Sequence, residues 1–203
     1  MYEITHTSLK AAREFLVKND PALGKFIQEI GVCSIIVKDD YFQSLVSSIV
    51  SQQLSTKAAD TIYGRLQTLS KGNIDPLTIK EIPRTDMRSI GISESKSRFI
   101  NELAHRYNES EFSSLHQLEN EEVLKFLTSF TGIGEWTAHI FMIFSLGRID
   151  VFPLKDVGLK NGMKRIYNLE ESDEKLLINI AEKWSPYKSI GSWYVWKSLS
   201  QFQ

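Results

Sequence analysis

The spacing of the apolar residues is the feature that most limits what this chain can fold into. Through most of its 203 residues they recur three and four positions apart, as on one face of an α-helix, and the alternation typical of strands is scarce. The clearest stripes predict helices over 8–19, 21–30, 41–50, 58–66, 93–104, 156–167, 172–183 and 186–200. We therefore expect an all-α protein.

Residues typical of helix ends accompany this pattern. We expect the first helix to begin after Thr7, the second to begin at Asp20-Pro21, and the last to open at Ser185-Pro186. Further N-caps are expected at Thr85, Ser93 and Asn120. No long linker interrupts the helices, so residues 1–203 are expected to form one unit, with room for two helical lobes.

Composition excludes several classes of protein. The only cysteine, Cys33, rules out an intramolecular disulfide and a Cys-rich zinc or iron–sulfur site. No apolar run approaches the roughly 18 residues of a membrane span and the start lacks a signal-peptide pattern, so we expect a soluble intracellular protein that contacts no membrane. The 24 basic and 25 acidic residues leave a net charge of −1, which argues against polycationic binding of nucleic acid.

One short segment, residues 130–138 (FTGIGEWTA), carries a chemical signal. A helix stops, Gly132 and Gly134 flank the apolar Ile133, and a very apolar helix follows at once. Glycines allow backbone angles and close approaches that side chains forbid, and the amides that open the second helix lie at the positive end of its dipole. Such a hairpin can bind a phosphate without a lysine, although a plain helix–helix turn has the same pattern.

A second motif at a matched spacing strengthens this signal. The hairpin resembles that of the helix-hairpin-helix DNA glycosylases, a superfamily with an essential Asp about twenty residues beyond the position held here by Trp136. In this chain that residue is Asp156, in the segment DVFPLKDVGL. Residues 42–55, 90–96 and 184–196 are similar to further segments of the superfamily, so the resemblance covers about residues 40–200. It is nearest to the alkyl-purine branch, the 3-methyladenine DNA glycosylases of the second type.

The resemblance implies an architecture and an activity. The architecture is two helical lobes, roughly 36–145 and 1–35 plus 146–203, with a DNA-binding and active-site cleft between them. The activity is that of a base excision repair enzyme that flips alkylated purines such as 3-methyladenine and 7-methylguanine out of double-stranded DNA and hydrolyses the N-glycosidic bond. No cofactor and no metal are implied. We expect a monomer in the cytoplasm or nucleoid of a prokaryote, or in a eukaryotic nucleus.

The resemblance assigns the chemistry to two residues. Asp156 is the expected catalytic carboxylate, because bond cleavage builds positive charge on the sugar. Asp156 would also suit the N-cap of the following helix, and the two roles are compatible. Trp136 stands where strand-cutting relatives carry a nucleophilic lysine, so water is the expected nucleophile and the enzyme is expected to be monofunctional. A core tryptophan at a helix start is the alternative for Trp136.

The base pocket is expected to be aromatic, because a cationic alkylated purine is attracted to electron-rich rings. The candidates for it are Trp136, Trp196, Trp193 and Tyr187. Other aromatic residues on helical stripes are interpreted as core, namely Phe126, Phe130, Phe141 and Phe144.

The DNA contacts are expected in two places. Gln53 and Leu54 are expected to fill the gap left by the flipped base, unless Gln52-Gln53 is only a polar kink between helices. The residues expected to hold DNA at the hairpin are Gly132, Ile133, Gly134 and Thr137.

Some features depart from the family pattern or leave alternatives open. Glu135 stands where Arg or Lys is frequent, which should weaken phosphate binding. Charge is uneven along the chain, with four basic residues against one acid between 155 and 165, so we expect modest, salt-sensitive affinity for DNA. The alternatives are a glycosylase for a deaminated or oxidised base, and a non-catalytic helix-hairpin-helix DNA-binding module.

Overall fold

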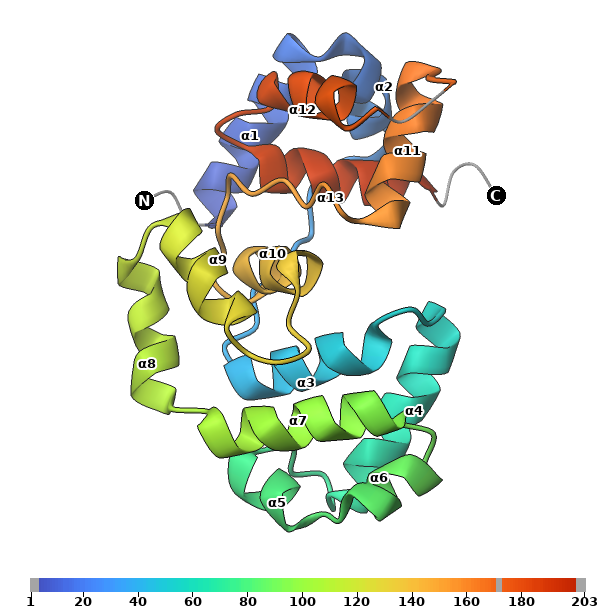
Figure 1. Cartoon of the computed structure of the whole chain (residues 1–203). Helices are drawn as coiled ribbons and strands as arrows, with labels where there is room; N and C mark the ends of the chain where they lie inside the picture. The colour runs from blue at the N-terminus through green and yellow to red at the C-terminus, as the bar shows by residue number, and fades with distance from the viewer. Residues whose placement is uncertain (1–3, 171–172, 200–203) are drawn as a thin grey trace. The chain divides into compact units, whose positions relative to one another are not determined.

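The computed structural model describes residues 4–170 and 173–199. Within them the chain forms thirteen α-helices and one 3-10 helix, with no strand (Figure 1). The prediction of an all-α fold is therefore confirmed. In chain order the elements are α1 (His6–Asn19), α2 (Pro21–Ile30), α3 (Tyr41–Ser51), α4 (Thr56–Leu69), α5 (Pro76–Glu81), α6 (Arg84–Ser89), α7 (Glu94–Arg106), α8 (Glu109–Ser114), η1 (Leu115–Gln117), α9 (Asn120–Thr128), α10 (Glu135–Phe144), α11 (Val157–Tyr167), α12 (Glu174–Glu182) and α13 (Lys188–Ser198).

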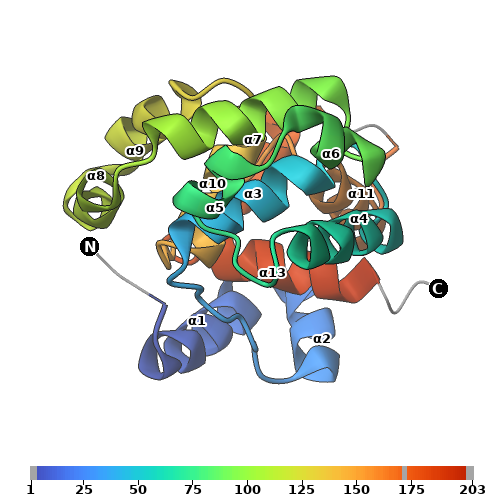
Figure 2. The same ribbon diagram turned by 90° about the horizontal axis from the view of Figure 1, so that it is seen from below.

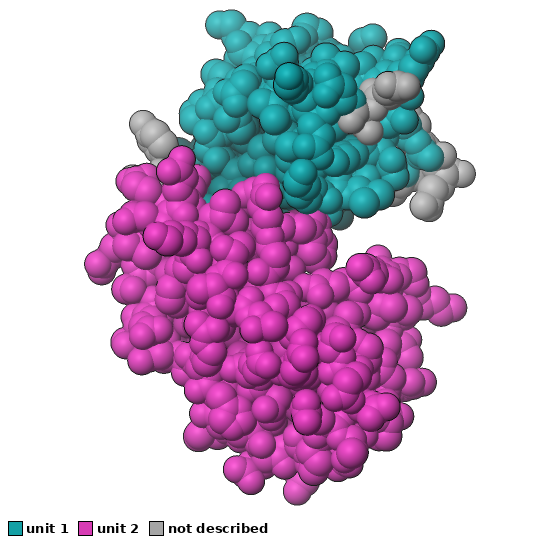
Figure 3. Space-filling model, in the orientation of Figure 1, with its two compact units in different colours: residues 1–37, 142–203 teal, residues 38–141 magenta. Residues whose placement is uncertain are grey.

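The chain divides into two compact units (Figure 3). Unit 1 consists of residues 1–37 and 142–203, and unit 2 consists of residues 38–141. Each unit has its own set of packed helices. The division falls inside α10, so this helix begins in unit 2 and ends in unit 1.

Unit 1 is built around α13. This helix packs against α1, α2, α11 and α12 (Figure 1). Its buried residues occupy all sides of it. Hydrogen bonds also connect the N-terminal and C-terminal segments of this unit. The carboxylate of Asp20, which caps α2, accepts hydrogen bonds from Tyr167 Oη at 2.5 Å and Trp184 Nε1 at 2.9 Å. Burial and the neighbouring Asp20 raise the pKa of Tyr167.

Unit 2 packs α7 against α3, α5 and α6, and α3 against α4 (Figure 2). The apolar stripe predicted on α3 is buried, with Phe42, Leu45, Val46, Ile49 and Val50 all at most 2% exposed. Helical spacing alone explains why these residues are buried together, because residues three and four positions apart lie on the same face of a helix.

Three predicted helix starts are wrong by one or two residues. The cap of α1 is Thr5 rather than Thr7, because the hydroxyls of Thr5 and Ser8 each accept a bond from the other's backbone N–H. Helix α6 begins at Arg84, after Pro83, so Thr85 lies within it. Helix α9 begins at Asn120 itself, and Glu119 precedes it.

The last helix begins two residues later than expected, at Lys188 rather than at Ser185-Pro186. The reason lies in a distant segment. The carboxylate of Asp150 accepts the Lys188 N–H at 3.0 Å and the Ser185 hydroxyl at 2.9 Å, which holds residues 185–187 outside the helix. The short helices α5 and α8 have too few residues to show a period and are not predicted. The predicted helix ends at residues 172 and 200 lie outside the described residues.

Candidate functional site

Asp156 lies at the point where α11 begins. Its Oδ1 accepts the backbone N–H of Leu159 at 2.6 Å, the bond of an N-cap. The same oxygen accepts the Nε1–H of Trp196, on α13, at 2.9 Å. Two elements of unit 1 therefore fix the orientation of a half-buried carboxylate at the positive end of a helix dipole. Such a group is suited to stabilising positive charge that develops beside it.

Close packing of α11 on α13 brings Trp196 within reach of Asp156. A Cβ added to Gly162 of α11 would lie 2.5 Å from Cγ1 and 3.1 Å from the carbonyl oxygen of Val195 of α13. A Cβ on Gly158 would lie 3.2 Å from Oδ1 of Asp156. A larger side chain at Gly162 would push the two helices apart, and one at Gly158 would crowd the Asp156 carboxylate, so both glycines help set the geometry of the carboxylate and its indole partner.

One aromatic residue outside the expected set lies beside Trp196. Phe144 lies beside Trp196, with ring centroids 5.8 Å apart at an interplanar angle of 32°. Phe144 is half-buried, and its interpretation as a core residue overlooks this contact. Only the tertiary fold reveals it, because Phe144 also fits an ordinary helical stripe.

Trp193 and Tyr187 serve the packing of unit 1. Trp193 is 6% exposed and meets Tyr194 edge to face, with centroids 5.1 Å apart. Tyr187 precedes the first turn of α13, the end of the helix remote from Trp196, and meets Phe15 edge to face at 5.3 Å. Their assignment to a base pocket stays a prediction.

The hairpin lies between α9 and α10, and Ile133 anchors it at 3% exposure. Gly132 has φ +84°, and a Cβ there would lie 2.2 Å from a ring carbon of Phe99 on α7, so only glycine fits. Gly134 differs from the expectation: its φ is not in the left-handed region, and a Cβ would meet nothing within 4 Å. The space beside Gly134 is open to a ligand.

The amides of α10 follow this opening. The carbonyl of Gly134 accepts the N–H of Ala138 at 3.0 Å, which is the first bond of the helix. The amides before Ala138 in the helix have no carbonyl of their own helix to bond. Glu135, which is exposed, is the first residue of the helix, and Trp136, which is half-buried, is the second. The assignment of Trp136 to base binding stays a prediction.

Thr137 supports the hairpin from inside the protein. Thr137 as a whole is 1% exposed, and its Oγ1 accepts a bond from Nε2 of Gln52 at 3.1 Å. The same Nε2 donates to the carbonyl of Gly132 at 2.8 Å. The assignment of Thr137 to DNA binding stays a prediction.

Gln53 and Leu54 form the turn between α3 and α4. Gln53 has φ +56°, which is uncommon for a residue with a side chain. Leu54 is 39% exposed although it is apolar, and Gln53 is also exposed. Sequence reasoning treated Gln52 only as part of a possible kink and Lys96 only as part of a matching segment. In the structure Nζ of Lys96 donates to the carbonyl of Gln52, and the side chain of Gln52 donates to the hairpin carbonyl of Gly132.

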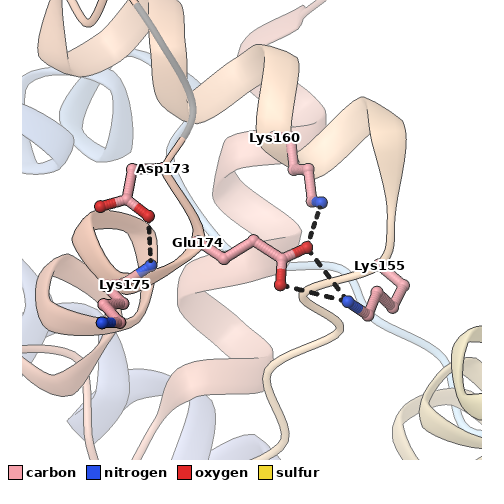
Figure 4. A network of polar contacts seen from close by, with 5 residues as sticks. All are labelled: Lys155, Lys160, Asp173, Glu174 and Lys175. Carbon is pink, nitrogen blue, oxygen red and sulfur yellow. Dashed lines mark hydrogen bonds and ion pairs between the residues drawn. The ribbon is translucent and has the colours of Figure 1, made fainter.

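Two lysines near Asp156 pair with an acidic residue, so they are less available to bind phosphate than the count of basic residues suggests. Nζ of Lys155 lies 3.1 Å from both carboxylate oxygens of Glu174, and Nζ of Lys160 lies 2.9 Å from Oε1 (Figure 4). Hydrogen bonds from Lys160 and then Lys155 lower the pKa of Glu174. Two of the four basic residues counted between 155 and 165 therefore share one acid in the free protein.

The described residues hold no group of three or more His, Cys, Asp or Glu side chains that could bind a metal ion. No helix in residues 4–170 and 173–199 is both long enough and apolar enough to cross a membrane.

Comparison with known proteins places this geometry in context. Residues 46–186 match the signature of the HhH-GPD superfamily base excision DNA repair protein. The chain is 33% identical over 172 residues to DNA-3-methyladenine glycosylase 1 of Schizosaccharomyces pombe, an alignment that covers 79% of this chain and 73% of the relative.

Two solved structures are similar over nearly the whole chain. A DNA-3-methyladenine glycosidase from Bacillus halodurans has a TM-score of 0.80 and 40% identity, with 94% of this chain and 90% of that chain covered. The S. pombe 3-methyladenine DNA glycosylase Mag1, solved in complex with abasic DNA, has a TM-score of 0.83 and 28% identity, with 94% and 97% covered.

Proposed function

Because the chain belongs to the HhH-GPD superfamily of base excision DNA repair proteins, we propose that it is a monofunctional 3-methyladenine DNA glycosylase whose catalytic carboxylate is Asp156. It hydrolyses N-glycosidic bonds of damaged double-stranded DNA. Its substrates are alkylated purines, 3-methyladenine and 7-methylguanine, and its product is an abasic site. We also propose that it acts as a monomer.

The fixed carboxylate of Asp156 is the observation that carries this proposal. As the bond between C1′ and the base nitrogen breaks, its electron pair leaves with the base and positive charge develops on the sugar. Asp156 stabilises that charge and orients the water whose oxygen bonds to C1′, and its carboxylate accepts the proton that the water loses. An alkylated purine carries positive charge and leaves neutral, so the reaction needs no general acid on the base.

The hydrolytic outcome follows from Trp136. An indole has no nucleophile that could attack the sugar, so no Schiff base forms and the strand stays intact. Trp136 and Trp196 offer aromatic faces to the cationic base. The open side of Gly134 and the first amides of α10 receive a DNA phosphate, while Gln53 and Leu54 enter the gap in the duplex.

The test is base release from methylated duplex DNA by the wild type and by Asp156→Asn. We expect the wild type to release 3-methyladenine and 7-methylguanine, and the variant to be slower by about 100-fold or more, as when another electrostatic stabiliser is removed from an active site. Asp173→Asn is the matched control, because Asp173 also caps a helix of unit 1, α12, by accepting the Lys175 N–H (Figure 4).

Each other outcome identifies a different error. Full activity of Asp156→Asn would remove Asp156 from the mechanism. A wild type that releases only deaminated or oxidised bases would correct the substrate, and one that binds DNA without releasing any base would indicate a binding module. A protein–DNA adduct trapped by borohydride would contradict the monofunctional mechanism.

A further inference from the structure

The turn at residues 51–55 is held in an uncommon conformation. Gln53 has φ +56°, and the N–H of Leu54 donates to the carbonyl of Ser51 at 3.1 Å. A residue with a side chain stays in this region of backbone angles only where its surroundings enforce it. Gln53 and Leu54 themselves are exposed, so the enforcing contacts have to come from the residues on either side.

Lys96 provides the first of these contacts. Its half-buried side chain reaches from α7 to the end of α3, where Nζ donates to the carbonyls of Val50 at 2.9 Å and Gln52 at 2.7 Å. The last carbonyls of a helix have no partner within it, and a cation there also meets the negative end of the dipole. Lys96 thus fixes the direction in which the chain leaves α3.

Gln52 provides the second contact. Its Nε2 donates to the carbonyl of Gly132 at 2.8 Å and to Oγ1 of Thr137 at 3.1 Å. Both acceptors belong to the hairpin or to the helix that follows it. One amide group therefore connects the residue directly before Gln53 to the hairpin, and both lie in unit 2.

We propose that Lys96 and Gln52 are positioning residues for DNA opening: they hold the Gln53-Leu54 turn in the conformation that enters the duplex and fix it to the hairpin. The proposal rests on the proposed function, because a wedge matters only if a base is flipped. Neither residue touches the reacting atoms. Their loss should leave the hairpin's phosphate contact in place and weaken the filling of the gap.

The experiment compares Lys96→Met, Lys96→Arg and Gln52→Leu with the wild type. The probe is a duplex with one tetrahydrofuran abasic site and 2-aminopurine as the neighbouring base, whose fluorescence reports unstacking. With DNA saturated by protein, we expect the wild type to change the fluorescence and Lys96→Met and Gln52→Leu to lose most of that change. Lys96→Arg should keep it, because a guanidinium can donate to both carbonyls.

Base release gives a second readout. In single-turnover release of 3-methyladenine from methylated duplex DNA, Lys96→Met and Gln52→Leu should slow the reaction about tenfold or more, and Lys96→Arg should stay within about threefold of the wild type. Lys10→Met, an exposed residue on α1, is the control for the loss of one positive charge. A thermal melt of each variant establishes that it is folded at the assay temperature, and if Lys96→Met does not fold, Gln52→Leu tests the same turn.

The outcomes separate this proposal from the function on which it rests. Wild-type fluorescence amplitude and release rate in both Lys96→Met and Gln52→Leu would overturn the positioning role, as would slow release with an unchanged amplitude. A wild type that releases no methylated purine would overturn the proposed function instead, and that result does not depend on any variant.

Discussion

At the scale of single residues, Asp156 shows what a short sequence motif can and cannot specify. Its spacing from Trp136 and its place before a helical stripe both point to a carboxylate at the start of α11, and the structure has Asp156 at that N-cap. The indole that donates to it, on Trp196, lies 40 residues further along the chain. No local pattern links the two residues, so their hydrogen bond became visible only in the folded chain.

The bond between Trp196 and Asp156 leads to a prediction. Trp196→Phe keeps an aromatic ring beside Phe144 but removes the Nε1–H donor. We expect kcat to fall about 10- to 100-fold, because a hydrogen bond to a charged group contributes about 1.5–3 kcal/mol, while KM changes less. Steady-state release of 3-methyladenine measures both constants.

The control for this substitution is Tyr194→Phe. Tyr194 is on the same helix as Trp196, but its hydroxyl donates to the carbonyl of Gly31 and not to Asp156. If Trp196→Phe raised KM and left kcat unchanged, Trp196 would act on base binding alone and not through the carboxylate.

At the scale of the elements, period and capping locate most helices, and the errors have physical causes. Helix α13 is buried on all sides, so its apolar residues show no single stripe. Its start is set by hydrogen bonds to Asp150, which lies in another segment of the chain. The capping preferences of residues 185–188 therefore do not predict it. Helices α5 and α8 are six residues each, less than two turns, which is too short for a period to appear.

The contact between α11 and α13 leads to an element-scale prediction. Gly162→Ala would place a Cβ 2.5 Å from Cγ1 of Val195, so the two helices have to separate. We expect the free energy of unfolding to fall by about 1–3 kcal/mol, the usual range for overpacking. Because α13 carries the indole that orients Asp156, kcat should fall as well.

Gly64→Ala is the matched control. Gly64 lies within α4, and a Cβ there would meet nothing within 4 Å. Alanine should therefore stabilise that helix by about 0.8–1.0 kcal/mol. Chemical denaturation measures whether each substitution raises or lowers the free energy of unfolding. A stabilised Gly162→Ala protein would show that the helices can adjust without strain.

At the scale of the whole molecule, near-neutral charge limits how tightly the protein can hold DNA. The net charge is −1, and the structure shows that Glu174 engages both Lys155 and Lys160 beside Asp156. Under the proposed function these lysines must exchange Glu174 for phosphate or remain paired with it. If they remain paired, fewer phosphates are neutralised, which predicts a modest affinity that depends on salt less steeply than the count of basic residues suggests.

Removing the acid tests this account. Glu174→Gln leaves both lysines available to phosphate, so we expect tighter binding to abasic duplex DNA at low salt. The slope of log K against log salt should steepen by about 0.9 for each phosphate newly contacted. Fluorescence anisotropy over a salt series measures the slope. Glu182→Gln is the control, since Glu182 is on the same helix and pairs with Lys188 alone.

An unchanged slope in Glu174→Gln would place Lys155 and Lys160 outside the DNA interface. An equal change in Glu182→Gln would show that total charge, and not the pair of lysines, governs the affinity.

The sequence by itself determined the all-α class, most helices, the hairpin glycines and the position of Asp156, because these follow from spacings of a few to about twenty residues. Helical periodicity, capping preferences and the backbone freedom of glycine depend on residues within one or two helical turns of each other. They can therefore be recognised in the sequence alone. The resemblance to the helix-hairpin-helix glycosylases added the chemistry expected at those positions.

Only the tertiary structure decided which residues surround them. Trp196 reaches Asp156, Phe144 reaches Trp196, Lys96 and Gln52 hold the Gln53 turn, and Glu174 engages two lysines. Each contact joins residues from different segments of the chain. The contact between Trp196 and Asp156 depends on how closely α11 packs on α13, which the missing Cβ of Gly162 allows. Such distances are properties of the packed core, and no local pattern in the chain encodes them.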